Sequence, residues 1–196
     1  MVEREEIKYE NYYKKKLTLM YPDEIIKFEV PMFTTHVRAD AVLLRDPITA
    51  FEIKTERDSL DRLKNQVRNY FKIFPHVCVV AHESKAEKAA EIVSCTCAEV
   101  WSVDNDGTVK TIVSGGIDRS HIDNDAVFAF LRKEEQKYIL QKYFHELPFS
   151  TDFNRYRDWQ EMFRQLPTEV VLKEMSSMCY LRWHDNKKSN DFWGLE

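Results

Sequence analysis

Glycine, proline and cysteine are scarce in this sequence, and long apolar runs are missing. The 196 residues include four glycines, six prolines and four cysteines. No run approaches the ~18 apolar residues of a transmembrane helix, so we predict no membrane span. The opening MVEREEIKYE is charged and lacks the apolar segment of a secretory signal. We therefore expect a cytoplasmic protein.

The cysteines do not follow a ligand pattern. Cys95 and Cys97 form a lone C-x-C, with no C-x-x-C or H-x-x-x-H beside it, whereas a zinc site needs further ligands at such spacings. Cytoplasmic thiols stay reduced. We expect small, buried, apolar thiols at these positions.

Positive charge is not in excess. The chain has 29 Lys and Arg against 33 Asp and Glu, a net charge of −4. Proteins that coat nucleic acid are usually basic, so this balance argues against a large non-specific contact area. A nuclease with a local basic groove around a metal ion is still compatible with it.

Apolar periodicity predicts an α/β core over residues 1–114. Expected helices lie at 3–21, 58–74 and 84–94, and expected strands at 24–30, 37–44, 48–54, 76–81, 98–103 and 108–114. Pro22 ends the first helix, and Asp58 is the expected N-cap of the second. In the first strand, Ile26, Phe28 and Val30 are expected on one face. The order predicts a mixed sheet flanked by helices.

The rest of the chain is expected to be helical. The Gly pair in SGGIDRS marks a boundary, and apolar faces recur at 122–144, 152–165 and 168–183. We predict a helical subdomain over 121–185 and a tail over 186–196. A homodimer or a protein partner could use these helices.

Three ionisable side chains lie inside the hairpin at residues 37–54. Residues two apart share a face of a strand, so Glu52 and Lys54 lie together. If the turn centres on Asp46, position 40 lies opposite position 52. The Cβ atoms of Asp40 and Glu52 would then be roughly 4.5–5.5 Å apart.

Two carboxylates so close repel each other unless a cation lies between them. Mg²⁺ prefers one or two carboxylates with water and phosphate oxygens. The pattern therefore favours a Mg²⁺ or Mn²⁺ site, at which Lys54 orients the attacking water or stabilises phosphate charge. The alternative is a salt bridge of Lys54 with Asp40 or Glu52 on an exposed sheet face.

These residues resemble the PD-(D/E)XK nuclease superfamily. Asp40 followed by Glu52-Ile53-Lys54 is similar to its Asp…(Asp/Glu)-X-Lys site, although Ala39 stands where many members have proline. The order α-β-β-β-α-β is the core of that fold. The resemblance implies a restriction-endonuclease-like domain followed by helices.

Two further motifs extend the resemblance. Gln66 and Tyr70 form a Q-x-x-x-Y similar to that of RecB-type and Cas4-type members, and residues four apart share a helix face. LRKEE at 131–135 resembles the L-x-(K/D)-E of a family of small bacterial and phage members. The resemblance reaches about residue 184.

The superfamily pattern implies a role for each residue. Asp40, Glu52 and the backbone carbonyl of Ile53 would be metal ligands, and Lys54 the catalytic lysine. Gln66 would steady the site or the scissile phosphate, and Tyr70 would do likewise or belong to the core. An additional acidic ligand would be Glu29 or Glu10.

Basic residues could contact the substrate. Arg38, expected on the face of Asp40, could hold a phosphate or pair with a carboxylate, and we leave both open. Arg57, Lys64 and Arg68 recur along the 58–74 segment beside Gln66 and could bind nucleic acid or form a solvated face.

The sequence therefore predicts a Mg²⁺- or Mn²⁺-dependent deoxyribonuclease that hydrolyses phosphodiester bonds with a metal-activated water. Two alternatives remain. One is a catalytically silent nuclease-fold module that binds nucleic acid, and the other is an accessory protein that binds a partner. DNA is the expected substrate, but strandedness and endo- or exonuclease action stay open.

Overall fold

The protein is described by a computed structural model that covers residues 2–32, 37–144, 147 and 152–184, with side chains for 11–32, 37–144, 147 and 156–184. The predicted tail lies outside these residues. The helices are α1 Val2–Met20, α2 Leu63–Phe71, α3 Glu83–Val93, α4 Asn124–Phe130, α5 Lys133–Tyr143, α6 Asp152–Arg164 and α7 Thr168–His184. The strands are β1 Ile25–Met32, β2 Val37–Leu44, β3 Thr49–Lys54, β4 His76–His82, β5 Glu99–Val103 and β6 Val109–Val113. The expected α/β class and element order of the first 114 residues are confirmed.

The six strands form one mixed sheet in the order of the chain, β1 to β6. The pairs β1–β2, β2–β3 and β5–β6 are antiparallel, whereas β3–β4 and β4–β5 are parallel. Parallel neighbours need a crossover, and α2 and α3 supply it. The Asp104–Gly107 turn joins β5 to β6, with Gly107 at φ 81°, where glycine is favoured.

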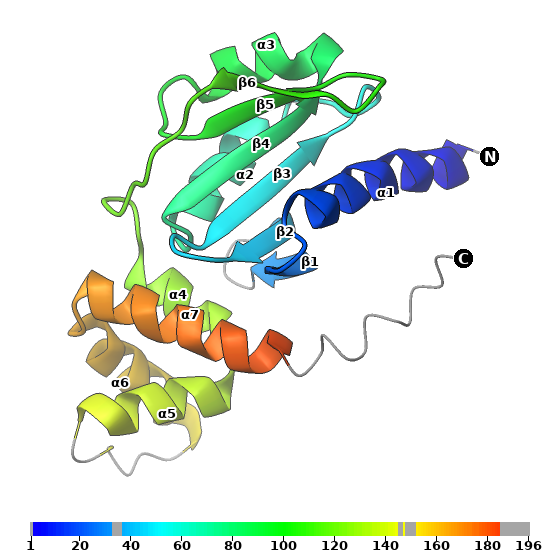
Figure 1. Cartoon of the computed structure of the whole chain (residues 1–196). Helices are drawn as coiled ribbons and strands as arrows, with labels where there is room; N and C mark the ends of the chain where they lie inside the picture. Colours follow the sequence, from blue (N-terminus) through cyan, green and yellow to red (C-terminus); the bar gives the residue numbers. More distant parts are fainter. Residues whose placement is uncertain (1, 33–36, 145–146, 148–151, 185–196) are drawn as a thin grey trace.

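Each face of the sheet is covered by helices, with α1 in front of the sheet and α2 behind it in Figure 1. On the α1 face, Tyr13 and Leu17 of α1 pack against Phe51, Ile53 and Trp101. The other face packs against α2, α3 and the C-terminal helices. All six residues of β3 are buried. The ionisable residues of β3 therefore lie in the interior, not on an exposed sheet face.

The prediction for the faces of β1 is wrong in part. Ile26 and Phe28 pack toward α1, as one face requires, but Val30 belongs to the core on the opposite face. Glu29 lies between them with φ 56°, in the left-handed region. A residue in that conformation breaks the alternation of an extended strand, so Val30 turns to the other side.

Helix α2 is shorter than the expected 58–74 segment. It begins at Leu63, and its N-cap residue Arg62 makes no side-chain capping bond. The expected N-cap, Asp58, instead accepts hydrogen bonds from the backbone N–H and the hydroxyl of Thr55, both at 2.7 Å. This acceptor closes the turn after β3, and the residues up to Arg62 stay outside the helix.

The expected helix at 122–144 is two helices. Leu131 and Arg132 have extended backbone angles between α4 and α5, and the backbone N–H of Arg132 donates to Glu135 at 2.8 Å. That acceptor favours a new helix start at residue 133. The helices expected at 152–165 and 168–183 are confirmed as α6 and α7.

The C-terminal helices share the core of the sheet. One continuous cluster contains Val30 and Val79 of the sheet together with Val127, Phe163 and Met175 of the helices. Glu174, 2% exposed, accepts from Lys142 and Tyr143 at 2.7 Å each, which ties α7 to α5. The sheet and the helices therefore bury apolar surface against each other.

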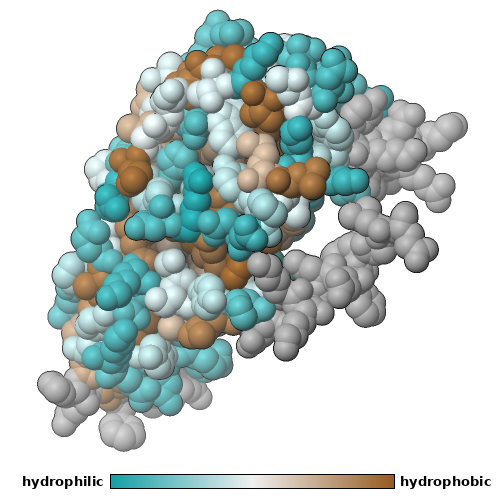
Figure 2. Space-filling view, in the orientation of Figure 1, coloured by the Kyte–Doolittle hydropathy of each residue, from teal (hydrophilic) through white to brown (hydrophobic). Residues whose placement is uncertain are grey.

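The face of the molecule seen in Figure 2 is mainly polar. Figure 2 shows hydrophilic residues over most of this face, with apolar residues in small separate groups.

The expectation of buried thiols is correct for two of the four cysteines. Cys78 and Cys179 are buried, but Cys95 and Cys97, in the turn after α3, are exposed. No helix in the described part of the chain is long and apolar enough to cross a membrane.

Candidate functional site

Asp40 lies where strands β2 and β3 separate. The ladder pairs Leu43 with Thr49 and ends at Ala41 with Phe51. This register has the predicted turn centre, so position 40 comes next to position 52. Beyond the ladder, the Asp40 carboxylate accepts from the backbone N–H of Ile53 at 2.6 Å. A charged side chain, and not a main-chain carbonyl of β2, is therefore the acceptor for the backbone N–H between Glu52 and Lys54.

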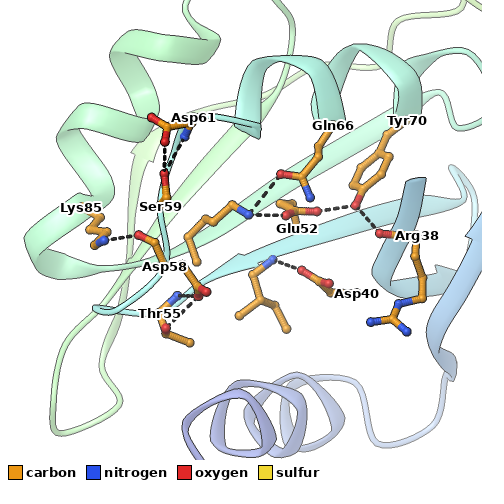
Figure 3. A network of polar contacts seen from close by, with 12 residues as sticks. Arg38, Asp40, Glu52, Thr55, Asp58, Ser59, Asp61, Gln66, Tyr70 and Lys85 are labelled. Carbon is orange, nitrogen blue, oxygen red and sulfur yellow. Dashed lines mark hydrogen bonds and ion pairs between the residues drawn. The ribbon is translucent and has the colours of Figure 1, made fainter. Parts of the chain in front are cut away.

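Glu52 and Lys54 form a buried ion pair. The Lys54 ammonium donates to Glu52 Oε1 at 2.6 Å, and the side chains are 1% and 7% exposed for Glu52 and Lys54. Glu52 lies on the sheet face that α2 covers, as Figure 3 shows, and Lys54 contacts Gln66 of the same helix. The i, i+2 spacing on a strand places them side by side. Opposite charges this deep lose hydration, so the pair needs further polar partners.

Helix α2 supplies those partners through its Q-x-x-x-Y spacing. Gln66 accepts from Lys54 at 3.1 Å. The hydroxyl of Tyr70 contacts Glu52 Oε2 and lies 2.8 Å from the backbone carbonyl of Arg38. Tyr70 is fully buried. The structure thus brings together Glu52, Lys54, Gln66 and Tyr70 in one network (Figure 3), and Tyr70 belongs to the core as well.

Burial governs the protonation of this network. Loss of hydration raises the pKa of Glu52, and the neighbouring Lys54 charge opposes that change. Burial, with the charges of Glu52, Asp40 and Glu29, also raises the pKa of Tyr70, which stays a neutral phenol. A phenol has one proton. The Tyr70 hydroxyl can donate that proton either to the Arg38 carbonyl or to the Glu52 carboxylate. If Glu52 were protonated, its own O–H could donate to the Tyr70 oxygen while Tyr70 donates to Arg38.

Glu29 lies in a different set of contacts. Its carboxylate contacts the Lys14 ammonium of α1 and the Arg38 guanidinium, the latter at 2.5 Å. Glu29, the predicted additional metal ligand, is therefore paired with two cations. Within the described ranges, no group of three His, Cys, Asp or Glu side chains is arranged to hold a metal ion. The side chain of Glu10 lies outside the described residues.

Arg38 pairs with a carboxylate, which is one of its two expected roles. The carboxylate belongs to Glu29 and not to the predicted metal site. The Arg38 side chain is 63% exposed, and Figure 3 shows it pointing away from Tyr70, whereas its carbonyl faces Tyr70. Exposure of the guanidinium is compatible with the phosphate contact, which stays a prediction.

Lys64 and Arg68 do not share the side of Gln66 on α2. Lys64 and Arg68 are exposed, and each is two positions from Gln66. Two positions correspond to about 200° around a helix, so these cations point to the opposite flank of α2. Arg57 lies before the helix, 3.9 Å from Glu56. Lys64 and Arg68 therefore do not point toward the ion pair.

Sequence reasoning missed two residues near the site. Arg62, four positions before Gln66, is exposed on the same side of α2, and helical phase alone would have favoured it over Lys64. Lys14 approaches Glu29 from α1. That contact depends on how α1 crosses the sheet, and no local spacing encodes it.

The loop from β3 to α2 is held at two points. Asp58 fixes Thr55 directly after Lys54. The ammonium of Lys85 in α3 donates to the backbone carbonyl of Asp58. Figure 3 shows both contacts beside the ion pair. The loop between Lys54 and Gln66 is therefore anchored independently of the helix that follows it.

Comparison with known proteins gives one family. The family model described as Bacteriophage P4 protein cII matches residues 4–195. Protein cII of Enterobacteria phage P4 is 28% identical over 137 residues, which are 69% of this chain and 51% of that protein. The chain thus spans about half the length of the curated relative it matches. No solved structure matches the chain.

Proposed function

The chain belongs to the bacteriophage P4 protein cII family, and we propose that it is a metal-dependent nuclease acting on DNA in the cytoplasm. We further propose that its sheet is a PD-(D/E)XK core. The order α1-β1-β2-β3-α2-β4 supports this assignment, with β3 antiparallel to β2 and parallel to β4. Fold alone does not decide function, so the proposal depends on the site.

One observation carries the proposal: the buried Glu52–Lys54 pair is held by Gln66 and Tyr70, with the Asp40 carboxylate on the residue between them. All five residues predicted from the motif thereby lie around one point of β3. A buried salt bridge that only stabilised the sheet would also need a polar partner such as Gln66, but it would not require the Asp40 carboxylate on the backbone of Ile53.

The donors suit a hard divalent cation. Asp40, Glu52 and the Ile53 carbonyl offer only oxygen, and Mg²⁺ commonly takes one or two carboxylates with water. Burial raises the pKa of Glu52, and a bound cation would keep it ionised. Such an ion, when bound, neutralises phosphate charge and lowers the pKa of a bound water.

The chain's own groups have defined tasks in this proposal. Lys54 has three N–H donors, and two of them have partners in Glu52 and Gln66. The third can donate to a phosphate oxygen and stabilise the charge that develops in the transition state. Tyr70 fixes the Glu52 carboxylate, and Asp40 fixes the backbone at Ile53.

A second function has an observation in its favour. Glu52 and Lys54 neutralise each other at 1% and 7% side-chain exposure. A catalytically silent module that binds nucleic acid or a partner would have such a closed network. Metal binding and cleavage separate the two functions.

The test uses purified protein with circular and linear DNA, single- and double-stranded, in Mn²⁺, Mg²⁺ or EDTA. We expect cleavage by the wild type that needs the metal, and none by Glu52→Ala. Glu87→Ala is the matched control, because Glu87 is an exposed acid on α3. Cutting of closed circles would indicate an endonuclease.

The melting temperature gives the second measurement. Mn²⁺ should raise it for the wild type and Glu87→Ala but not for Glu52→Ala, because only a ligand that binds the native state stabilises it. Cleavage that persists in Glu52→Ala contradicts the site. A Mn²⁺ shift without cleavage of any substrate favours the silent module.

A further inference from the structure

Three charged side chains meet beside the site from three elements. Lys14 comes from α1, Glu29 from β1 and Arg38 from β2. Glu29 Oε1 contacts the Lys14 ammonium, and Glu29 Oε2 lies 2.5 Å from Arg38 Nε. The Lys14 ammonium also lies 5.8 Å from the centre of the Phe28 ring. We call Lys14, Glu29 and Arg38 the α1 cluster.

The α1 cluster presents the guanidinium of Arg38 to solvent. Side-chain exposure rises from 18% for Lys14 through 32% for Glu29 to 63% for Arg38. The guanidinium offers five N–H donors in a planar fork that suits a phosphate. An incoming anion would therefore meet Arg38 first and Lys14 behind it.

The backbone at Glu29 is held in an unusual conformation. Its φ of 56° is rare for a residue other than glycine. Backbone strain persists only where surrounding contacts fix it, and here the two ion pairs lie on the strained residue's own side chain. The conformation turns Glu29 toward Lys14 and Arg38 and shifts Val30 to the opposite face of the sheet.

The α1 cluster is joined to the catalytic network through Arg38. The carbonyl of Arg38 accepts from Tyr70, which contacts Glu52. Asp40 follows two residues later and binds the backbone of Ile53. A nucleic-acid strand whose phosphate lay at Asp40 would place a neighbouring phosphate close to Arg38.

We propose that the α1 cluster is a phosphate subsite for the nucleic-acid strand, in which Glu29 positions Lys14 and Arg38 and is not a metal ligand. The inference rests on the proposed nuclease function for its substrate class. It assigns Lys14 a binding role and, among the residues whose side chains the structure describes, limits the metal ligands to Asp40, Glu52 and the Ile53 carbonyl.

The first arm measures binding without cleavage. Affinity for a short fluorescein-labelled oligothymidylate is measured by anisotropy in EDTA over a range of salt concentrations. Arg38→Gln and Lys14→Gln should each weaken binding and lower the slope of log Kd against log salt by about 0.7, the value for one lost single-strand phosphate contact. Lys110→Gln, at an exposed position on β6 at the opposite edge of the sheet from β1, should leave the slope unchanged.

The second arm separates positioning from metal binding. Glu29→Gln should keep the rise in melting temperature that Mn²⁺ causes, whereas Glu52→Gln should lose it. Arg38→Lys, which keeps the charge without the planar fork, should recover part of the affinity lost in Arg38→Gln. Arg38 is well exposed, so its variants test the subsite even if Lys14→Gln folds poorly.

Unchanged salt slopes in Arg38→Gln and Lys14→Gln would overturn the subsite, and so would a wild type that binds no oligothymidylate. Loss of the Mn²⁺ shift in Glu29→Gln would make Glu29 a ligand and overturn its positioning role. If the slopes of Arg38→Gln and Lys14→Gln are reduced but the wild type never cleaves DNA, the result would support the subsite and count against the proposed nuclease.

Discussion

At the scale of single residues, the charge of Lys54 influences the protonation state of Glu52. A carboxylate that is 1% exposed is costly to ionise, and the Lys54 ammonium at 2.6 Å offsets that cost. Burial nevertheless raises the pKa of Glu52. The native state therefore binds this proton more tightly than the unfolded chain does, and the associated stability is present at low pH and lost as pH rises through the folded pKa.

Replacing Lys54 with methionine should destabilise the protein more at pH 8 than at pH 5. The variant removes the charge that lowers the pKa of Glu52. At pH 8 Glu52 must then be a buried unpaired anion or take up a proton, and breaking a buried pair costs about 3–5 kcal/mol. At pH 5 the proton is available at less cost. Urea unfolding at both pH values measures the difference.

The double variant Lys54→Met with Glu52→Gln is the control, because it removes both charges. Its stability relative to the wild type should depend less on pH than that of Lys54→Met alone. Equal destabilisation of Lys54→Met at pH 5 and pH 8 would show that Glu52 does not titrate between them.

At the scale of elements, the strands followed from sequence better than the helix ends did. The β2–β3 register was predictable because a turn centred on Asp46 places position 40 opposite position 52, and the observed ladder has that centre. The bounds of β2 were also predicted as observed. The start of α2 was not predictable, because Asp58 suits an N-cap and a turn acceptor equally. The positive φ of Glu29 left no sequence signal, since glutamate rarely adopts it.

Asp58→Ala should loosen the end of β3 and leave α2 in place. The variant removes the acceptor for two hydrogen bonds from Thr55, and bonds to a charged group are worth about 1.5–3 kcal/mol. Amide hydrogen exchange should speed up at Thr55 and stay unchanged at Val67 and Tyr70. Faster exchange along α2 instead would mean that Asp58 caps the helix after all.

Asp61→Ala provides the comparison. Asp61 is exposed and contacts Ser59, so its loss should change the free energy of unfolding by about 0.5 kcal/mol or less. Amide hydrogen exchange at Thr55 should be as slow in Asp61→Ala as in the wild type.

At the scale of the whole molecule, the sheet and the C-terminal helices depend on one core. The sequence predicts a helical subdomain over 121–185 because the Gly pair at 115–116 looks like a boundary. Sequence spacing cannot show that Val127 and Phe163 join the same buried cluster as Val30 and Val79. Contacts between distant segments come from tertiary packing, which apolar periodicity does not specify.

The shared core predicts that sheet and helices unfold together. Phe163 is fully buried and lies 5.2 Å from the ring of Phe128, so Phe163→Ala should cost about 3–5 kcal/mol. Tryptophan fluorescence can follow each part, because Trp101 lies in β5 while Trp159 and Trp183 lie in α6 and α7. Variants that keep either Trp101 or the two helical tryptophans should give coincident urea transitions.

Phe163→Ala should then shift both transitions by the same amount, whereas Tyr180→Ala, at a position 51% exposed on α7, should shift neither. A shift of the helical probes alone would mean that the helical subdomain predicted over 121–185 unfolds by itself. Coincident shifts mean that a ligand or partner bound to the C-terminal helices also stabilises the sheet that holds Glu52 and Lys54, because one cooperative unit is stabilised as a whole.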